Sequence, residues 1–583
     1  MGLFSFSNER HKQPSSRLAL AFLVLLSVAL CQAWVTPSPT TCFHDRTSLH
    51  LKPHCFFPRR ISTFRIGSQT KDDSDPDETP PLLATNDGVL TTDEETISSG
   101  TKQYSSTGEA VLDLAIPALG ALLIDPLMTL ADTAFVGRFS DTPDALGGMG
   151  SAAALLTFSF YLFGFLTKVT TPLVSSKRAS GNEEGAMAVG GQALSLALGM
   201  GSILTLVLLV FRNQLLGAMG AVDAGPATFN YATDFLVIRT LAAPAVLCIS
   251  ASTGILRGYL DTKTSIVILV AANMINLALD IVLIVYGHMG PLGAAIATTS
   301  AEWISAVLFL GVLAGRLPSA AGELGSNRTG RSSLIEDDDE DGIVIVPAFS
   351  IPPWEEIEPL VIASSSVFLR SLVLQFALSS AAALAARNGK RDFAASLGSH
   401  QIGIQLWLLC SFISDALAAA SQGLVADALG RESKEDAREV AKTVFGYSLG
   451  LGLTLGSALY IGSASNFLID FFTQDKATQL ELARILPLII FSQPLNSLVF
   501  AADGVLEGSS LFTFQAQSMV ASVAVTLGLY LTLQSVGYAD GDTVVQVWSC
   551  LIFLQFMRGI TASWKIAQKE GPIDILASSS TVR

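Results

Sequence analysis

The chain has 583 residues, of which 50% are hydrophobic and only 15% are charged. Soluble domains carry about 25% charged residues, so this composition excludes an ordinary water-soluble enzyme and indicates a membrane protein. The 35 basic and 50 acidic residues give a net charge of −15, which argues against a nucleic-acid partner, because such partners select basic surfaces. The six cysteines form no CxxC pattern, so no disulfide framework, zinc site or other cofactor site is predicted.

The first 33 residues are typical of a signal peptide. Arg17 precedes an apolar run that ends in CQA, which offers small side chains at the expected cleavage site. Residues 34–71 are rich in Ser, Thr, Arg and His and nearly free of acids, as in an organelle transit peptide. Together they resemble the two-part plastid presequence of algae with complex plastids, and an ordinary signal peptide with an unstructured tail is the alternative. Residues 72–110 are acidic and poor in apolar residues, so we expect disorder there.

Twelve apolar stretches of about 20 residues follow, each long enough to cross about 30 Å of hydrocarbon as a helix. Six lie within residues 111–316 and six within 356–567, and the acidic stretch 317–355 separates them. We predict an all-α membrane protein of twelve transmembrane helices in two six-helix lobes, with a flexible linker between the lobes and a short tail at 568–583. The expected spans are 111–131, 145–168, 188–211, 234–256, 264–286, 291–314, 357–386, 393–416, 440–462, 484–506, 512–534 and 543–564.

The two halves repeat one another at an offset of about 250 residues. Pro244 in the fourth span corresponds to Pro494 in the tenth, and Gly254 corresponds to Gly504. Each half has an even number of spans, so both enter the membrane from the same side and are related by an axis along its normal. We therefore expect a substrate cavity between the halves. These prolines and glycines, with Pro126 in the first span, are candidate hinge or packing positions.

Basic residues in the short loops predict the orientation in the membrane. They are more frequent on the side of the two termini, so both ends are expected to face the cytosol or stroma. With the leader, this predicts a multi-pass protein of a plastid envelope. The plasma membrane or an endomembrane is the alternative.

Polar residues inside the apolar runs are candidate functional residues, because a charge at mid-membrane costs roughly 2.5 to 3.5 kcal/mol on insertion scales. Asp132 lies in the first span, while Asn273, Asn276 and Asp280 share one helical face of the fifth. We predict that Asp132, Asn276 and Asp280 converge to hold a coupling proton or cation, since two acids in one site titrate as a pair, and that Asn273 faces the substrate. The alternatives are a headgroup-level position for Asp132 and structural hydrogen bonds for the other two.

The second half lacks equivalent acids and carries cations instead. We predict that Arg370, Gln375, Asp415, Gln555 and Arg558 line the substrate cavity there and that the two arginines attract an anion. The alternative is that each arginine extends to the membrane surface or pairs with a structural acid such as Asp415.

The stretch PLMTLADTAFVGR around Asp132, the N-x-x-x-D of Asn276 and Asp280, and SLGSHQIGIQLWLLCSFISDALAAASQGLVADALGR in the eighth span resemble the multidrug and toxic compound extrusion (MATE) family. They resemble its DinF-like branch best, to which plant citrate and salicylate-pathway exporters also belong. The resemblance covers about residues 110–567. It implies a V-shaped pair of lobes and antiport of a small organic anion or xenobiotic against H⁺ or Na⁺ by alternating access, with coupling residues at Asp132, Asn276 and Asp280. We expect a monomer.

Three other classes fit the sequence less well. A lipid-linked precursor flippase of the same superfamily would call for more basic cavity residues and extra spans. A major facilitator carries G-x-x-x-D-R-x-G-R-R after its second span, where this chain has SSKRASGNEEGA. A membrane-embedded enzyme would need clustered His or Cys ligands or a nucleophile elbow, and beyond the leader only His288 and His400 occur. The sequence therefore predicts a transporter and not an enzyme.

Overall fold

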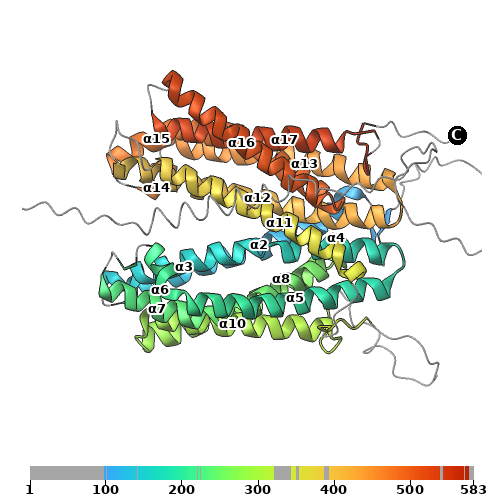
Figure 1. Cartoon of the computed structure of the whole chain (residues 1–583), viewed down its shortest axis with the longest axis horizontal. Coiled ribbons are helices and arrows are strands. Elements are labelled where there is room, and N and C mark those ends of the chain that lie inside the picture. Colours follow the sequence, from blue (N-terminus) through green and yellow to red (C-terminus); the bar gives the residue numbers. More distant parts are fainter. Residues whose placement is uncertain are drawn as a thin grey trace, which may run out of the picture. The chain divides into compact units, whose positions relative to one another are not determined.

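A computed structural model describes residues 97–576 of the chain, and its longest gaps are 321–342, 349–353 and 386–392. The expected signal peptide, the transit segment and most of the acidic stretch lie outside the described residues, as does the middle of the linker. The described residues form two bundles of helices (Figure 1). Eleven of their helices are long and apolar enough to cross a membrane, and one bent pair makes a twelfth span. The prediction of twelve spans in two six-span lobes is confirmed.

Each predicted span corresponds to one helix or to two consecutive helices. The first lobe contains α2 (Thr107–Phe139), α3 (Pro143–Leu162), α4 (Phe165–Ala179), α5 (Glu183–Val210), α6 (Arg212–Ala218), α7 (Pro226–Thr240), α8 (Ala243–Gly258), α9 (Thr262–Asp280), the π-helix η1 (Ile281–Tyr286) and α10 (Gly290–Leu313). The second lobe contains α11 (Trp354–Ala385), α12 (Phe393–Gly430), α13 (Lys434–Ala464), α14 (Phe467–Phe472), α15 (Lys476–Gly508), α16 (Phe512–Val536) and α17 (Thr543–Ile566).

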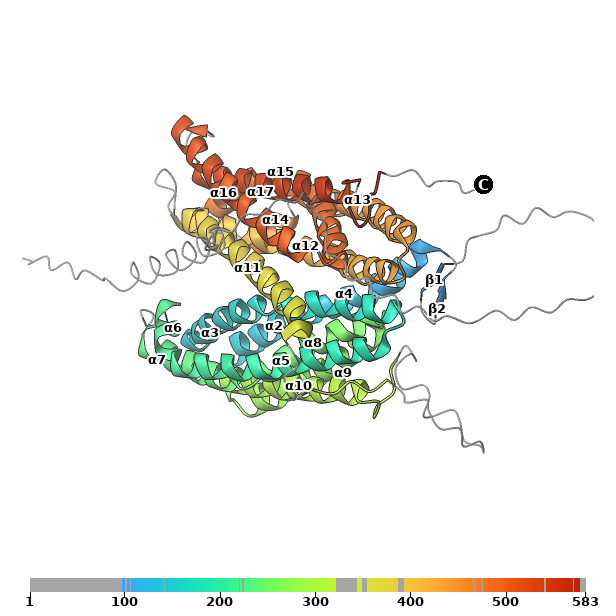
Figure 2. The same ribbon diagram turned by 45° about the vertical axis from the view of Figure 1, so that its right-hand side comes forward.

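Two short strands precede the first helix. β1 (Ile97–Ser99) lies beside β2 (Lys102–Tyr104) (Figure 2). The two strands pair antiparallel, and the register places Ile97 opposite Tyr104. The pair lies inside the stretch 72–110 for which the composition predicts disorder, and α2 also begins within it. β-branched and aromatic residues favour extended backbone, so a local hairpin forms here even though the stretch as a whole is acidic.

The fourth span is broken, whereas its counterpart in the second lobe is continuous. α7 and α8 meet at 48° just before Pro244, while α15 runs through Pro494 without interruption. A proline has no amide hydrogen, so the carbonyl four residues earlier loses its donor. At the break, the hydroxyl of Thr205 donates to the Thr240 carbonyl at 2.9 Å and the Trp303 indole donates to the Leu241 carbonyl at 3.2 Å. These side chains stabilise the bend.

Close helix contacts repeat in the two lobes. A β-carbon at Gly201 would collide with Pro244, and one at Gly452 would collide with Pro494. Gly254 and Gly504 likewise leave no room for a side chain, because the backbone of α4 and of α12 presses against them respectively. Pro244, Pro494, Gly254 and Gly504 are therefore packing positions, and the same contacts recur about 250 residues apart, as expected from a duplication. Pro126 lies inside α2 and is exposed, so no such contact forms there.

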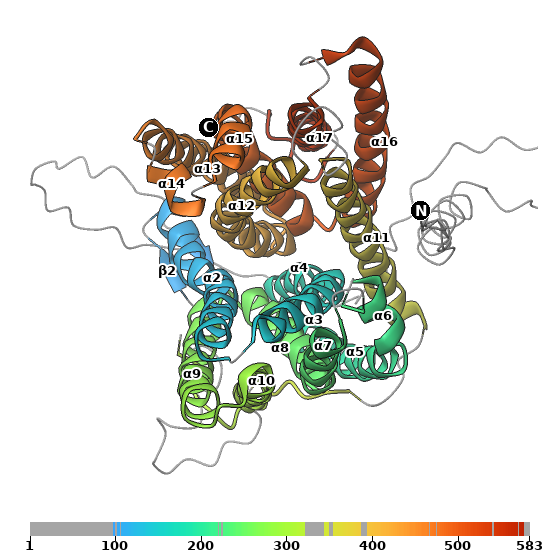
Figure 3. The same ribbon diagram turned by 90° about the vertical axis from the view of Figure 1, so that its left-hand side faces the viewer.

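The first helix of each half packs into both lobes (Figure 3). The opening turns of α2, with Val111 and Leu114, belong to a core cluster made mainly by α12, α13 and α15 of the second lobe. The opening turns of α11, with Leu360 and Val367, belong to a core cluster of α4, α5 and α8 in the first lobe. The lobes therefore exchange the ends of α2 and α11, and a boundary at 316 or 356 does not separate two independent cores.

The last part of the linker also packs against the first lobe. The amide of Ile345 donates to the Leu313 carbonyl at 2.8 Å, and the Ser195 hydroxyl donates to the Ala348 carbonyl at 2.7 Å. Ile345 is buried in the core of the first lobe. The composition predicts a flexible linker over 317–355, but the apolar IVIVP that follows its acidic run behaves as a packed segment.

Candidate functional site

The predicted acids of the first lobe come together in its interior. Asp132 on α2 is 6% exposed, and Asp280, the last residue of α9, is fully buried. Their carboxyl groups lie close enough to interact directly. α9 changes into the π-helix η1 immediately after Asp280, and such local widening of a helix is frequent at functional positions. Helix α2 and the end of α9 thus place two carboxyl groups in one buried site.

The polar atoms of this site are short of partners. Apart from the neighbouring Asp132 carboxyl, no described group forms a hydrogen bond with the carboxylate oxygens of Asp280, and neither amide atom of the buried Asn276 has a described partner. Leaving a buried polar group unpaired costs about 1–3 kcal/mol. Three side chains, Asp132, Asn276 and Asp280, therefore present oxygen atoms that a proton or a small cation can satisfy.

Helix α10 adds two residues that the sequence interpretation missed. The hydroxyl of Thr298 lies 3.1 Å from Oδ2 of Asp132. One turn later, Glu302 forms an ion pair with Arg239 of α7, and the charge of Arg239 also acts on Asp132. The signal for Arg239 and Glu302 was present, because both are ionisable residues inside apolar spans, but their partnership joins residues that lie 63 positions apart.

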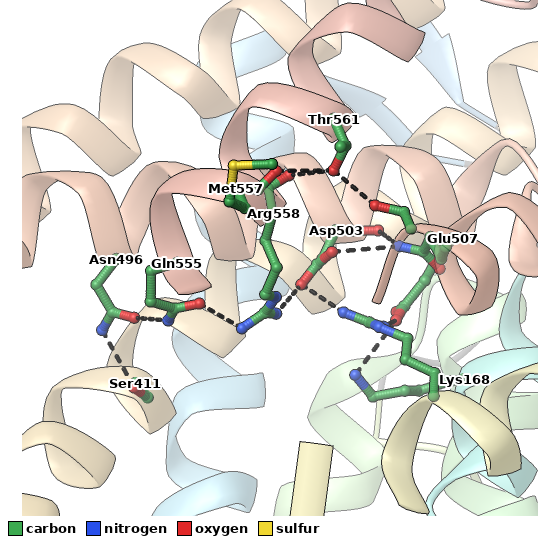
Figure 4. A network of polar contacts seen from close by, with 12 residues as sticks. Lys168, Ser411, Asn496, Asp503, Glu507, Gln555, Met557, Arg558 and Thr561 are labelled. Atoms are coloured by element: carbon green, nitrogen blue, oxygen red, sulfur yellow. Dashed lines mark hydrogen bonds and ion pairs between the residues drawn. The ribbon is translucent and has the colours of Figure 1, made fainter. Parts of the chain in front are cut away.

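The second lobe holds a buried ionic cluster (Figure 4). Arg370 on α11 donates to Oδ2 of Asp503 at 2.5 Å and to Oε1 of Glu507 at 2.7 Å, and both acids lie on α15. Arg558 on α17 donates to Asp503 at 2.5 Å. Lys168 on α4 of the first lobe reaches Glu507 at 3.3 Å. The charges of Arg257 and Asp415 act on the same groups, so four cations face three carboxylates and one positive charge is in excess.

A chain of side-chain hydrogen bonds extends the cluster from α17 to α15 and α12 (Figure 4). Arg558 donates to Oε1 of Gln555 at 2.5 Å, Gln555 donates to Oδ1 of Asn496 at 2.7 Å, and Asn496 donates to the Ser411 hydroxyl at 3.1 Å. The predicted arginines and Gln555 are therefore joined in one network. The sequence interpretation missed Asp503 and Glu507, although two acids four residues apart in an apolar span are a visible signal.

Among the described residues, the remaining predicted ones form no hydrogen bond or ion pair with either network. Asn273 is half-buried on α9 and donates its amide to the Leu269 carbonyl of its own helix at 2.8 Å. Asp415 on α12 is half-buried, and its charge acts on Lys168. Gln375 is half-buried on α11.

The arrangement offers acid–base and ion-pair chemistry. Among the described residues, no group of three or more His, Cys, Asp or Glu could hold a metal ion. One lobe holds a carboxylate pair with unsatisfied oxygens, and the other holds a cluster with net positive charge. Two parallel six-span repeats with ionisable groups buried in each define a membrane transporter.

Comparison with known proteins identifies the family. The MatE family profile matches residues 117–282 and again residues 367–532, once in each lobe and over more than half of the chain. The chain therefore belongs to the MATE family of transporters, as the sequence motifs predict, and it is not an enzyme.

Curated relatives match along most of this chain. Protein DETOXIFICATION 44, chloroplastic, of Arabidopsis thaliana is 28% identical over 81% of this chain and 84% of its own length. DNA damage-inducible protein F of Escherichia coli is 26% identical over 80% of this chain and 94% of its own length. The outward-facing conformation of a multidrug resistance MATE family transporter superposes with a TM-score of 0.66 at 17% identity, over 79% of this chain and 95% of that one. The structural likeness confirms the fold.

Proposed function

We propose that this transporter is an antiporter that exports a small organic compound in exchange for a proton, by alternating access, in a plastid envelope membrane. Two relatives whose names carry the word chloroplastic support the plastid membrane, as does the transit-like leader. The DETOXIFICATION relatives support a small organic cargo. The choice of a proton as the coupling ion rests on the buried carboxylates.

One observation supports a proton as the coupling ion: Asp132 and Asp280 act on one another in the interior of the first lobe, and no described donor group forms a hydrogen bond with either oxygen of Asp280. A carboxyl pair that is sealed from lipid and water can share a proton and release it when the site opens to the other side of the membrane. Protonation removes one negative charge from the lobe, so it changes the energy difference between the two open states. The oxygens of Asn276 and Thr298 would equally suit Na⁺.

Proteoliposomes with the purified full chain test this function. Uptake of a labelled cationic dye or organic anion is measured under two conditions. The first has an outward proton gradient at equal sodium, and the second has an outward sodium gradient at equal pH. The proposal expects uptake only with the proton gradient. Asp280→Asn keeps the shape of the side chain but removes the ionisable group, so it should abolish gradient-driven uptake and retain dye–dye counterflow.

The exposed Asp470 on α14 supplies a matched control. Asp470→Asn removes one carboxylate outside the site and should transport like the wild-type protein. Full proton-driven uptake by Asp280→Asn would show that the coupling site lies elsewhere. Uptake driven by the sodium gradient alone would identify Na⁺, and not the proton, as the coupling ion.

A further inference from the structure

Helices α7, α8 and α10 lie side by side in the first lobe (Figure 3). A short stretch of α10, residues 298–303, contacts two different parts of this lobe. At one end, the hydroxyl of Thr298 donates to Oδ2 of Asp132 at 3.1 Å. At the other end, the indole of Trp303 donates to the Leu241 carbonyl at 3.2 Å. We call residues 298–303 the bridge segment, because they connect the carboxyl pair with the break between α7 and α8.

The bridge segment also holds the last turn of α7 through an ion pair. Nη2 of Arg239 donates to Oε1 of Glu302 at 2.8 Å, and Nη1 donates to the other carboxylate oxygen. The two side chains are 12% and 20% exposed. Two parallel hydrogen bonds between a guanidinium and a carboxylate fix the orientation of the groups as well as their distance. The pair therefore sets the position of the end of α7 relative to α10.

The charge on Arg239 links this pair to the coupling acids. It acts on Asp132 and Asp125 as well as on Glu302. The ionisable groups around Asp132 among the described residues are Asp125 from its own helix, Asp280 from α9, Arg239 from α7 and Glu302 from α10. Four carboxyl groups thus face one cation. An ionised Asp132 competes with Glu302 for Arg239, and protonation of Asp132 ends that competition.

The break is placed to respond to this competition. Two residues, Leu241 and Ala242, separate α7 from α8, and Arg239 lies in the last turn before them. The carbonyls of Thr240 and Leu241 accept hydrogen bonds from side chains of α5 and α10. Hinges in proteins consist of a few residues at the ends of elements, where small changes in backbone angle swing a whole helix. The 48° bend is therefore a hinge directly beside the Arg239–Glu302 pair.

The second lobe provides an internal comparison. Pro494 occupies the position equivalent to Pro244, but α15 is continuous through it. At the offset that relates these two prolines, the position equivalent to Arg239 is Ile489, a fully buried core residue. The bend, the guanidinium beside it and the carboxyl pair thus occur together in one lobe. Ionisable groups inside a membrane span are costly, so their place next to the bend indicates a role in its movement.

We propose that the Arg239–Glu302 pair transmits the protonation state of Asp132 and Asp280 to the break, and that α7 changes its angle to α8 as the acids take up and release protons. An ionised Asp132 draws Arg239 toward itself, and after protonation Glu302 alone holds the guanidinium. Arg239 and Glu302 are positioning residues, since they act through Asp132. The proposal rests on the proton-coupled antiport described above and adds the element of the first lobe that moves.

Fluorine NMR of the full chain, labelled with 5-fluorotryptophan and purified in detergent, reports the state of the break. The chain has six tryptophans, and the resonance that is missing from Trp303→Phe belongs to Trp303. Its chemical shift should move as the pH is lowered, because the hydrogen bond to the Leu241 carbonyl changes with the angle of α7. The double variant Asp132→Asn, Asp280→Asn should abolish the movement, whereas Asp125→Asn should keep it.

A charge-neutral double variant tests the ion pair itself. Arg239→Gln, Glu302→Gln removes one charge of each sign and leaves both coupling acids in place, so the Trp303 resonance should no longer move with pH. Proton-driven uptake should fall roughly tenfold, while counterflow continues. Arg239→Lys keeps the positive charge and should retain part of the movement. Circular dichroism establishes that each variant is folded.

An ion pair of the second lobe gives the matched control. Arg431 and Asp436 lie 2.9 Å apart after the end of α12 and at the start of α13. Arg431→Gln, Asp436→Asn removes the same two kinds of charge away from the break. This variant should show the wild-type movement of the Trp303 resonance and the wild-type rate of uptake.

Three results would overturn the proposal. They are a Trp303 resonance that does not move with pH in the wild-type protein, movement that survives in Arg239→Gln, Glu302→Gln, and movement that survives in Asp132→Asn, Asp280→Asn. The NMR titration needs neither cargo nor an ion gradient, so the two proposals fail separately. Movement without gradient-driven uptake supports the transmission and refutes the antiporter. Proton-driven uptake without movement refutes the transmission alone.

Discussion

Arg370 and Arg558 donate to the same atom: Oδ2 of Asp503 lies 2.5 Å from a nitrogen of each guanidinium. The two arginines come from α11 and α17, and the acid comes from α15, so one carboxylate joins three helices of the second lobe. Gln515 of α16 adds a fourth helix by donating to the backbone carbonyl of Asp503 at 3.1 Å. Asp503 is therefore the central anion of this lobe.

Asp503→Asn should destabilise the second lobe. The substitution leaves two buried guanidinium groups without their shared counter-charge, and breaking a buried pair in this way typically costs about 3–5 kcal/mol. Thermal unfolding in detergent should show a clear drop in melting temperature. Adding Arg558→Gln should recover part of the loss, because it removes one uncompensated cation. An unchanged melting temperature in the single variant would mean that the cluster is well solvated.

Thr298→Val should slow proton-driven uptake while counterflow continues. The valine has the shape of threonine but no hydroxyl, so Oδ2 of Asp132 loses a donor that lies 3.1 Å away and that it shares with the Ala294 carbonyl at 2.9 Å. A hydrogen bond to a charged group contributes about 1.5–3 kcal/mol, which corresponds to roughly a tenfold change or more. Initial uptake rates measure the effect. Thr298→Ser should restore the rate, and Thr299→Val, whose hydroxyl faces the Ile238 carbonyl, should transport normally.

The repeated glycines give a stability test with internal controls. Gly201→Ala and Gly452→Ala should each destabilise the protein by about 1–3 kcal/mol, because the added methyl group overpacks a tight contact with Pro244 or Pro494. Gly199 and Gly450 lie one half-turn earlier on the same helices, where a β-carbon would meet nothing within 4 Å. Alanine at either control position should leave stability unchanged or raise it slightly. Thermal unfolding compares all four variants.

The start of α15 should lose stability in acid. Asp475 accepts hydrogen bonds from the hydroxyl of Thr478 at 2.6 Å and from its amide at 2.8 Å, and these bonds hold the pKa of the Asp475 carboxyl below its usual value. A lowered pKa means that the ionised form favours folding. This contribution is complete above the unfolded-state pKa of about 3.9 and disappears as the pH falls through the folded-state value.

Asp475→Asn keeps a side chain that can cap the helix but removes the titration. The advantage of the wild-type protein in melting temperature should therefore shrink as the pH falls from about 5 to about 3. A difference that stays constant over this range would assign the stabilisation to the hydrogen bonds of either side chain and not to the charge.

Length and hydropathy were sufficient to predict the spans, since each requires only a run of apolar residues. The same simple rule located Asp132 and Asp280, because an ionisable side chain in an apolar run is costly and is therefore a candidate functional residue. It would also have located Asp503, Glu507, Arg239 and other buried charges if it had been applied to every span.

Partnerships could not be predicted in this way. Arg370 and Asp503 lie 133 positions apart, and nothing local to either residue indicates that they meet. The different outcomes at Pro244 and Pro494 also depend on distant residues, since the bend in the first lobe is supported by donors from α5 and α10. A motif that is the same in both halves can therefore fold differently in each.

The exchange of the opening turns of α2 and α11 affects how the chain is assembled. The core that surrounds Val111 and Leu114 is built mainly from helices that begin at residue 393 or later, so a ribosome finishes α2 long before most of its neighbours exist. During synthesis the apolar residues at this end of the first helix therefore have no second-lobe core to pack against. A truncated product that stops after the first lobe would expose it, which gives cellular quality control a simple way to recognise half-made copies.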